Sequence, residues 1–348
     1  MSALDVRDLR VQFDTEDGVV KAVDGVSFSV APGRTLGIVG ESGSGKSVAN
    51  MTILGLTRAP NAHISGQVMS RGRDLVELPN EELRQVRGDE IAMIFQDPLS
   101  SLHPFYRVGN QLVEAVQVHR ETTVAEARSR AVELLGLVGI PEPERRLDDY
   151  PHEFSGGMRQ RAMIAMALVN DPEVLIADEP TTALDVTTQA QILALIERLQ
   201  SELGMAVILI THDLGVVAET ADEIAVMYAG RIVERGPARD LFASPQHPYT
   251  WGLLRSIPRL TAARDEELVP IAGQPPSLIN PPSGCSFHPR CPYVRDRHRK
   301  VEPKLEALPG EREHQVACLL EADTRARLWA ELQAGRDPAE ARASVGAG

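Results

Sequence analysis

The sequence predicts an α/β fold in which a parallel sheet is interrupted by a helical insertion. Three short apolar runs, at residues 35–40, 173–178 and 206–211, have the length and β-branched content of strands buried on both faces. Residues 187–204 show the apolar spacing of an amphipathic helix, and helical spacing also prevails over residues 109–170. Strands that alternate with helices in this way are typical of a parallel sheet.

Further strands are predicted on both sides of this core. Residues 4–13 and 19–30 have strand character, residues 91–96 form another buried run, and residues 222–236 have the pattern of a hairpin. After residue 244 the chain becomes Pro-rich and poorly periodic, which predicts a linker leading into a small separate unit. The predicted division is a main domain at 1–244 with a helical part at about 97–170, a C-terminal region at 245–330 and a flexible tail at 331–348.

Charge and composition exclude several classes of protein. The chain has 36 basic and 49 acidic residues, a net charge of -13, which argues against nucleic-acid binding because that requires a basic surface. It has no apolar run long enough for a membrane-spanning helix, and its start lacks the pattern of a secretory signal. Its three cysteines all follow residue 284 and do not have the pattern of a disulfide framework.

Residues 40–47 read GESGSGKS and match G-x-x-x-x-G-K-[ST] at every fixed position. Glycines let backbone N–H groups turn inward around phosphate oxygens, and the helix that follows adds positive potential. The lysine reaches the β- and γ-phosphates, and the last hydroxyl coordinates Mg²⁺. The loop by itself indicates only nucleotide binding. We expect ATP and Mg²⁺ to be held by Gly40, Ser42, Gly43, Ser44, Gly45, Lys46 and Ser47.

Polar residues end three of the predicted strands. Asp178 ends the run VLIAD, at the carboxyl edge of the sheet where ligands bind, and it can hold Mg²⁺ through water. Glu179 beside it can polarise the attacking water as a general base. His212 follows the strand 206–211 and suits a γ-phosphate contact, and Gln96 ends the run 91–96, where it could reach the metal or the water.

A second helix start carries small polar residues. Ser155, Gly156 and Gly157 precede a helical run, which makes another N-terminus suited to an anion. Two such sites can face one phosphate only if they come from different subunits. The alternative is that these residues merely turn the chain into the helix.

Together, these motifs resemble those of ABC-type ATPases over residues 3–245. The segment FSGGMRQ at 154–160 is similar to the family's LSGGQ signature, from which Phe154 and Met158 depart. The resemblance also rests on the phosphate loop, VLIADE, Gln96, ALD at 183–185 and His212. It implies a RecA-like core, an antiparallel β subdomain and a helical signature subdomain.

The resemblance also implies a head-to-tail dimer of nucleotide-binding domains. ATP would lie between one chain's phosphate loop and the signature of the other, with Ser155, Gly156, Gly157 and Gln160 acting in trans. Asp185 would sit at the dimer seam, and the segment DPLSSLHP after Gln96 would meet the membrane partner. Phe13 is the candidate for stacking on adenine, with a plain core position as the alternative.

The C-terminal sequence indicates which branch of the ABC family this chain resembles. SPQHPYTWGLLRSIPRL and GQPPSLINPPSGCSFHPRCPY resemble the oligopeptide/dipeptide importer ATPases, a branch that also includes nickel transporters. In some members four cysteines of this region hold an iron–sulfur cluster. This chain has Cys285, Cys291 and Cys318, with His298 where the family has the other cysteine.

Three alternatives stay open for these residues. They are a [4Fe-4S] cluster with one histidine ligand, a Zn²⁺ site, and three free thiols around a Pro-rich fold. His288 is a second possible nitrogen ligand. A metal would have a structural role, since a small loop-rich unit gains stability from such a link.

The resulting hypothesis is an ATP-hydrolysing importer subunit for di- and oligopeptides, with nickel or another small solute as the alternative. Its expected partners are two membrane-spanning permease subunits, a second ATPase subunit and, indirectly, an extracytoplasmic solute-binding protein. A heterodimer is favoured over a homodimer, and the expected location is the cytoplasmic face of the plasma membrane. A soluble ABC protein acting on ribosomes or DNA, and a binding-only subunit with an inactive site, are the competing hypotheses.

Overall fold

The computed structural model describes residues 2–97, 101–182, 184–256, 270–311 and 313–346. In these ranges the central sheet has eight strands in the order β11-β12-β10-β9-β3-β8-β7-β6. Neighbours from β9 to β6 run parallel, and β10, β12 and β11 pair antiparallel at one edge. Its strands are β3 (Thr35–Val39), β6 (Ile91–Ile94), β7 (Val174–Asp178), β8 (Ala206–Thr211), β9 (Glu223–Tyr228), β10 (Arg231–Pro237), β11 (Glu306–Ala307) and β12 (Gln315–Val316).

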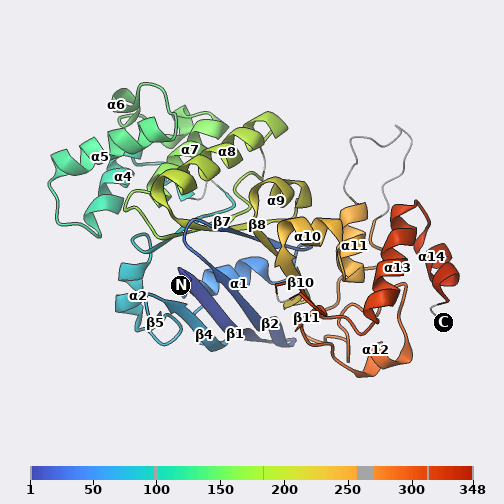
Figure 1. Ribbon diagram of the computed structural model, residues 1–348. Coiled ribbons are helices and arrows are strands. Elements are labelled where there is room, and N and C mark those ends of the chain that lie inside the picture. Colours follow the sequence, from blue (N-terminus) through green and yellow to red (C-terminus); the bar gives the residue numbers. More distant parts are fainter. Residues whose placement is uncertain (1, 98–100, 183, 257–269, 312, 347–348) are drawn as a thin grey trace.

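A second, antiparallel sheet lies below the central one (Figure 1), with the strand order β2-β1-β4-β5. Two of its strands were predicted from sequence, and the third long strand was missed because its first six residues are exposed or half-buried and carry little apolar pattern. Helix α1 lies between the two sheets in Figure 1, and α2 follows β5. The elements are β1 (Leu4–Thr15), β2 (Gly18–Val30), β4 (Ala62–Ser70), β5 (Arg73–Asp74), α1 (Lys46–Ile53) and α2 (Asn80–Val86).

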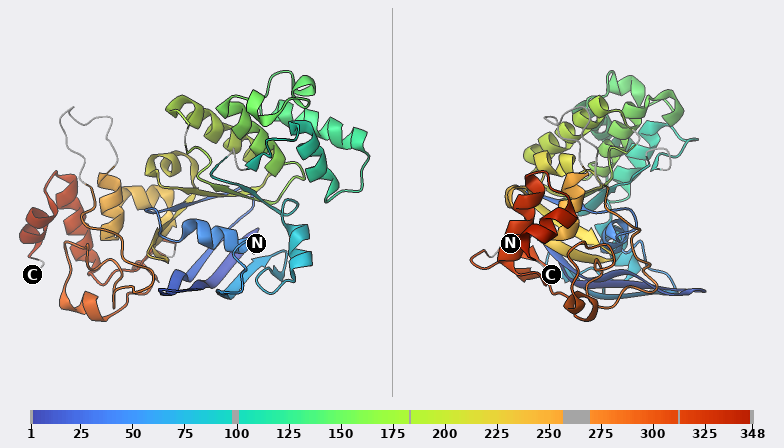
Figure 2. Two further views of the ribbon diagram at one scale, coloured as in Figure 1. Left: turned by 180° about the vertical axis from the view of Figure 1, so that it is seen from behind. Right: turned by 90° about the vertical axis from the view of Figure 1, so that its right-hand side faces the viewer.

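Helices cover the upper face of the central sheet, as the views from behind and from the side also show (Figure 2). Helix α5 begins with a capping box in which Thr123 and Glu126 exchange hydrogen bonds. The helices of this layer are α4 (Val108–Gln117), α5 (Val124–Leu137), α6 (Pro143–Arg146), η1 (Pro151–Glu153), α7 (Gly156–Ala167) and α8 (Val186–Leu203), with α9 (Leu214–Thr220) after β8. Helices α4 to α7 lie within the stretch, about 97–170, that was predicted as the helical part.

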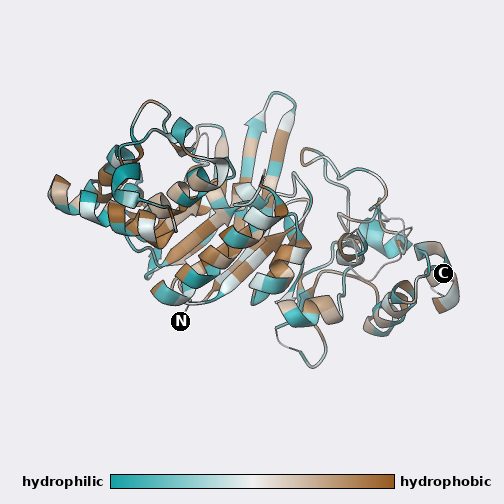
Figure 3. Ribbon diagram, turned by 90° about the horizontal axis from the view of Figure 1, so that it is seen from above, coloured by the Kyte–Doolittle hydropathy of each residue, from teal (hydrophilic) through white to brown (hydrophobic). Residues whose placement is uncertain are grey.

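The central strands are buried on both faces because each separates two apolar cores. In β7, Leu175 and Ala177 join the core beneath the helices, whereas Val174 and Ile176 join the core shared with the lower sheet. Strand β8 alternates in the same way. Figure 3 shows the result from above, with largely brown central strands and helices that alternate between brown and teal. The short, continuous apolar runs of the sequence have this cause.

The C-terminal region differs from the predicted separate unit. Strands β11 and β12 extend the central sheet beside β10, and Cys285 and Phe287 belong to the core under the helices. In the described part of the predicted flexible tail at 331–348, α14 is capped by Asp337, and Ala341 lies in the same core cluster as Trp251 and Trp329. Residues 245–346 are called the C-terminal region below; its helices are α11 (Pro248–Arg255), α12 (Asp296–Lys300), α13 (Ala322–Gln333) and α14 (Pro338–Val345), and α10 (Ala238–Ala243) precedes it.

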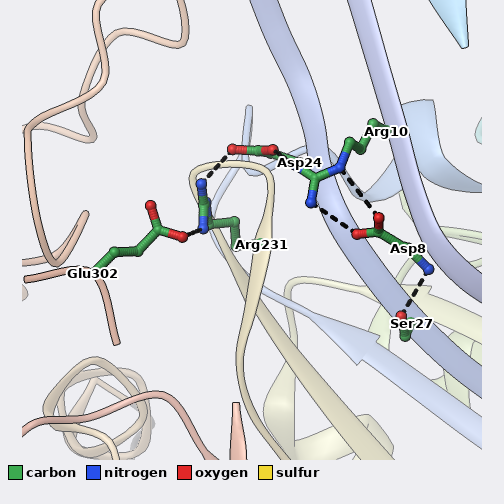
Figure 4. A network of polar contacts seen from close by, with 6 residues as sticks. All are labelled: Asp8, Arg10, Asp24, Ser27, Arg231 and Glu302. Atoms are coloured by element: carbon green, nitrogen blue, oxygen red, sulfur yellow. Dashed lines mark hydrogen bonds and ion pairs between the residues drawn. The ribbon is translucent and has the colours of Figure 1, made fainter. Parts of the chain in front are cut away.

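An ion-pair network also joins the C-terminal region to the lower sheet (Figure 4). Glu302 pairs with Arg231 of β10, and Arg231 pairs with Asp24 of β2. Asp24 in turn pairs with Arg10 of β1, which also binds Asp8. Three segments far apart in the sequence are thus connected by one chain of alternating charges.

Candidate nucleotide site

The phosphate loop connects the buried strand β3 to helix α1. Its glycines at positions 40, 43 and 45 have φ angles of 154°, 77° and 99°. A Cβ at Gly40 would lie 2.2 Å from the carbonyl oxygen of Met227, and one at Gly45 would lie 2.3 Å from that of Ala22. At Gly40 and Gly45, larger residues are therefore excluded by both the backbone conformation and the lack of space. The glycine spacing of the motif thus has a direct structural cause.

Lys46 lies inside this loop. Its Nζ donates to the carbonyl oxygens of Gly40, at 2.7 Å, and of Glu41, at 3.0 Å. Burial lowers the pKa of Lys46, against the opposing effect of nearby carboxylates. Ser44 is also buried, and its Oγ has no hydrogen-bond partner in the part of the chain that the structure describes. A buried cation and an unpaired hydroxyl within one loop suit the phosphates of a nucleotide.

Ser47 and Asp178 meet at the carboxyl edge of the sheet. The Ser47 hydroxyl donates to Oδ1 of Asp178 over 3.2 Å. Burial raises the pKa of Asp178 above its ordinary value. Hydroxyl and carboxylate oxygens are ligands that Mg²⁺ prefers, usually together with phosphate and water. These two residues fit a Mg²⁺ ion, which when bound would neutralise charge on the phosphates.

Glu179 is the centre of a group of polar side chains. Its Oε2 accepts hydrogen bonds from Nε2 of Gln96 and from the Thr182 hydroxyl, both at 2.9 Å, and its Oε1 lies 3.2 Å from Nδ1 of His212. Its φ angle of 47° is in the left-handed region, which turns the chain sharply after β7. Burial raises the pKa of Glu179, but hydrogen bonds from His212 and Thr182 outweigh this effect and lower it below its ordinary value. The residues predicted from three strand ends are therefore brought together around one ionised carboxylate.

The signature residues lie at the start of α7. The Ser155 Oγ accepts a hydrogen bond from the backbone N–H of Met158 over 3.3 Å, and a Cβ on Gly156 would meet no atom within 4 Å. This helix start is therefore open to solvent. Gln160 is placed differently from the prediction, because its side chain is buried and donates to the carbonyl oxygen of Pro180 within the same chain. In this position Gln160 holds the turn after Glu179, and its side chain is not exposed to a second subunit.

Two other predicted residues have local roles in the structure. Asp185 caps α8 by accepting hydrogen bonds from the backbone N–H of Thr188, at 3.0 Å, and from its hydroxyl, at 2.6 Å. These bonds lower the pKa of Asp185. Phe13 lies on β1, half-buried against the core of the lower sheet. Part of DPLSSLHP, at 98–100, and Ala183 of ALD lie outside the described residues.

Comparisons with known proteins agree with this geometry. The pattern of the ABC transporter family matches residues 23–182, and that of the oligopeptide/dipeptide transporter C-terminal region matches residues 233–297. The oligopeptide transport ATP-binding protein of Bacillus subtilis is 53% identical, with 87% of this chain and 85% of the relative covered. A probable peptide ABC transporter ATP-binding protein of Sinorhizobium fredii is 55% identical, with 90% and 94% covered. The chain belongs to the oligopeptide/dipeptide family of ABC transporter ATP-binding proteins.

Solved ABC cassettes share the fold. An ATP-binding cassette solved as a dimer with ADP and phosphate has a TM-score of 0.61 at 28% identity, covering 68% of this chain and 99% of that one. A subunit of an ABC transporter complex from Clostridium perfringens has a TM-score of 0.59 at 30% identity, covering 70% and 91%. The predicted ABC-type fold is thus confirmed, and the chain is an ATPase of this family. Within the described ranges, no helix has the length and apolar content needed to cross a membrane.

The predicted metal site of this ABC protein is not supported. Among the residues that the structure describes, no three His, Cys, Asp or Glu side chains gather to hold a metal ion. Cys285, Cys291 and Cys318 are free, and burial raises the pKa of all three thiols, that of Cys318 to about 11. His298 Nδ1 accepts a hydrogen bond from the backbone N–H of Arg295, and its Nε2 is buried without a hydrogen-bond partner among the described residues. Neither a [4Fe-4S] cluster nor Zn²⁺ is therefore assigned here.

Sequence reasoning missed three residues that contact the ATP site of this ABC cassette. Thr182 binds Glu179 and lies only three residues after it, so the run EPTT was an available signal. Tyr249 and Arg290 come from the C-terminal region and bind Glu41 of the phosphate loop. Nothing in their local sequence indicates that contact, because 208 and 249 residues separate the partners.

Proposed function

We propose that this chain is the ATP-hydrolysing subunit of an importer for di- and oligopeptides. The proposal that the chain hydrolyses ATP rests on the arrangement of Gln96, Thr182 and His212 around the Glu179 carboxylate. Lys46 and the Ser47–Asp178 pair lie at the same edge of the sheet, and the negative charge of Glu179 acts to raise the pKa of Lys46. A base and a phosphate-binding loop are thus adjacent.

In this proposal each residue has one task. The phosphate loop and Lys46 bind the phosphates, and Ser47 with Asp178 holds Mg²⁺. Glu179 accepts a proton from the water that attacks the γ-phosphate, and the low pKa of its carboxyl keeps it ionised for this purpose. His212 contacts the γ-phosphate, and Gln96 orients the water or the metal. Phe13 remains the candidate for adenine stacking.

The site is completed by a second subunit in this proposal. The open start of α7 at Ser155, Gly156 and Gly157 offers backbone N–H groups to the phosphates bound by a partner ATPase. The dimeric state of the solved cassette supports this arrangement. Asp185 would lie at the seam. The partner is a second, different ATPase subunit or another copy of this chain.

The transport assignment comes from the relatives. Curated relatives are named as oligopeptide and dipeptide transport ATP-binding proteins, and the C-terminal region matches that family's own pattern. The proposed partners are accordingly two permease subunits and, indirectly, a solute-binding protein. The proposed location is the cytoplasmic face of the membrane.

Uptake measurements test this proposal. A strain that lacks the chain and a strain complemented with it are compared for uptake of a radiolabelled tripeptide and of ⁶³Ni²⁺. We expect complementation to restore tripeptide uptake, and Glu179→Gln and Lys46→Ala to abolish it. Restoration of nickel uptake alone would replace the peptide assignment, and unchanged uptake of both solutes on deletion would refute the importer role.

A further inference from the structure

Glu41, the first variable residue of the phosphate loop, is held by contacts to its N–H group, its carbonyl oxygen and its carboxylate. The backbone N–H of Glu41 donates to the Tyr249 hydroxyl over 2.8 Å. Its carbonyl oxygen accepts from Lys46, and its carboxylate is bound by Arg290. Tyr249 and Arg290 both belong to the C-terminal region, so two of the three contacts come from outside the ATPase domain.

The Arg290–Glu41 pair has the geometry of a strong ion pair. Nη1 of Arg290 lies 2.6 Å from Oε2 of Glu41, and Nη2 lies 3.0 Å from Oε1. Such paired bonds fix orientation as well as charge. The Arg290 side chain is 3% exposed, and that of Glu41 is 28% exposed. This pair is therefore much better shielded from solvent than a surface salt bridge.

The rest of the guanidinium is also held. Its Nε donates to the carbonyl oxygen of Ala272 at 3.0 Å, and Nη2 donates to that of Ile271 at 3.2 Å. Its Cζ lies 5.8 Å from the ring centre of Tyr228 on β9. Burial acts to lower the pKa of Arg290, but its bonds to Glu41 raise the pKa by more than burial lowers it. The pKa of Arg290 therefore lies above its ordinary value, and the side chain stays charged. The Arg290 cation is thus positioned before any nucleotide binds.

A carboxylate in a phosphate loop is unfavourable for ATP binding, because it repels the phosphates at short range. Glu41 is close enough to Lys46 for its negative charge to act on the pKa of that lysine, in the raising direction. An unpaired Glu41 carboxylate would therefore compete with ATP for Lys46. Pairing with Arg290 cancels this charge and holds the carboxylate in one place.

We infer that Arg290 is a positioning residue for ATP binding, through which the C-terminal region holds Glu41 away from the phosphates and keeps the phosphate loop in its binding conformation. The inference rests on the proposed role of the loop in binding ATP. It makes the affinity of the loop for nucleotide depend on whether the C-terminal region is docked. A preformed loop binds more tightly because less ordering is needed on binding.

The experiment measures the Kd of a fluorescent ATP analogue and the KM and kcat of ATP hydrolysis for the full chain. We expect Arg290→Gln to raise Kd and KM about tenfold, a size typical of coupled sites, with kcat changed less than about twofold. We expect the double variant Arg290→Gln with Glu41→Gln to recover most of the affinity, because no unpaired carboxylate remains. A merely structural role for Arg290 predicts the opposite, namely a double variant that binds no better than the single one.

The matched control is Glu302→Gln, which breaks another ion pair between the C-terminal region and the cassette without touching the loop (Figure 4). Its Kd should equal that of the unmodified protein. If Arg290→Gln does not fold, Arg290→Lys takes its place, with about a threefold rise in Kd because the paired geometry is lost while the charge remains. Unchanged Kd in the Arg290 variant, or no rescue in the double variant, would overturn the inference. Failure of the unmodified chain to bind ATP would instead refute the proposed nucleotide site.

Discussion

The proposed role of Glu179 as a general base sets two requirements for this residue. A general base must be ionised at the working pH and must also be fixed in orientation. The hydrogen bonds from Gln96, Thr182 and His212 satisfy both, because they favour the charged form and limit rotation of the side chain. The left-handed backbone at Glu179 places the carboxylate beyond the end of β7.

Replacing Glu179 by Gln should separate binding from hydrolysis. The amide keeps the size of the side chain but cannot accept a proton, so we expect kcat to fall about 10²- to 10⁴-fold with little change in the Kd for ATP. Lys46→Ala should instead raise Kd. Both are measured with the partner subunits present. A Glu179→Gln variant that hydrolyses ATP at the normal rate would rule out this base.

The pH dependence of hydrolysis should respond to Thr182. The pKa of Glu179 lies below its ordinary value of 4.5, so the carboxyl is ionised above that pH and the rate is lost only as pH falls through the lowered pKa. Thr182→Val removes one hydrogen bond to the charged form and keeps the shape of the side chain. We expect the acid limb of the kcat profile to move to higher pH. An unmoved limb would mean that this bond does not tune the base.

At the scale of elements, helix starts serve different tasks. The start of α1 forms the end of the phosphate loop, and that of α7 is exposed at Ser155 and Gly156. The start of α14 is purely local, since Asp337 Oδ1 accepts from the backbone N–H groups of Ala339 and Glu340 at 2.7 and 2.8 Å. Glu340 bonds back to the Asp337 N–H over 3.1 Å and completes a capping box.

Removing this cap should loosen α14. Asp337→Ala leaves two backbone N–H groups without their acceptor, at a cost of about 1 kcal/mol, whereas Asp337→Asn should be nearly neutral because asparagine also caps well. Amide hydrogen exchange of residues 339–345 checks the effect. Faster exchange in the alanine variant alone is expected. Equal exchange in both variants would show that burial of Ala341 in the core cluster of Trp251 and Trp329, not the cap, holds the helix.

At the scale of the whole molecule, one buried carboxylate joins the C-terminal region to the ATPase domain. Glu234 of β10 is 0% exposed and accepts from the backbone N–H groups of Gln246 and His247, at 2.6 and 2.9 Å. His314, just before β12, lies 2.8 Å from the same carboxylate. Three polar groups from two segments of the C-terminal region therefore depend on one side chain for their hydrogen bonds.

Glu234→Ala should accordingly destabilise the protein strongly. Three buried polar groups lose their partner, and we expect a loss of about 3 kcal/mol in the free energy of unfolding, measured by denaturant titration. Glu302→Ala is the matched comparison, because Glu302 is 57% exposed and its pair with Arg231 should contribute at most about 1 kcal/mol. Similar losses in the two variants would contradict the assigned role of Glu234.

The sequence predicts the parallel core, and it brings forward the residues proposed for the ATP site, because their signals are local. The loop, Asp178, Glu179 and His212 each end a strand, and strand ends meet at one edge of a parallel sheet. The docking of the C-terminal region was not predictable in this way. Glu41 meets Arg290, and Glu234 meets His314, across 249 and 80 residues of chain. A pairing of side chains so distant leaves no periodic pattern in either segment.

The short strands β11 and β12 have a further consequence for solubility. The β10 backbone at Glu234 and Arg235 pairs with Val316 and Gln315, so the C-terminal region covers an edge of the central sheet. An uncovered edge presents free N–H and C=O groups to other chains and promotes sheet-to-sheet aggregation. A chain cut after residue 244 would keep every ATP-site motif and still expose this edge. The C-terminal region therefore also keeps the β10 edge from pairing with the sheet of another chain.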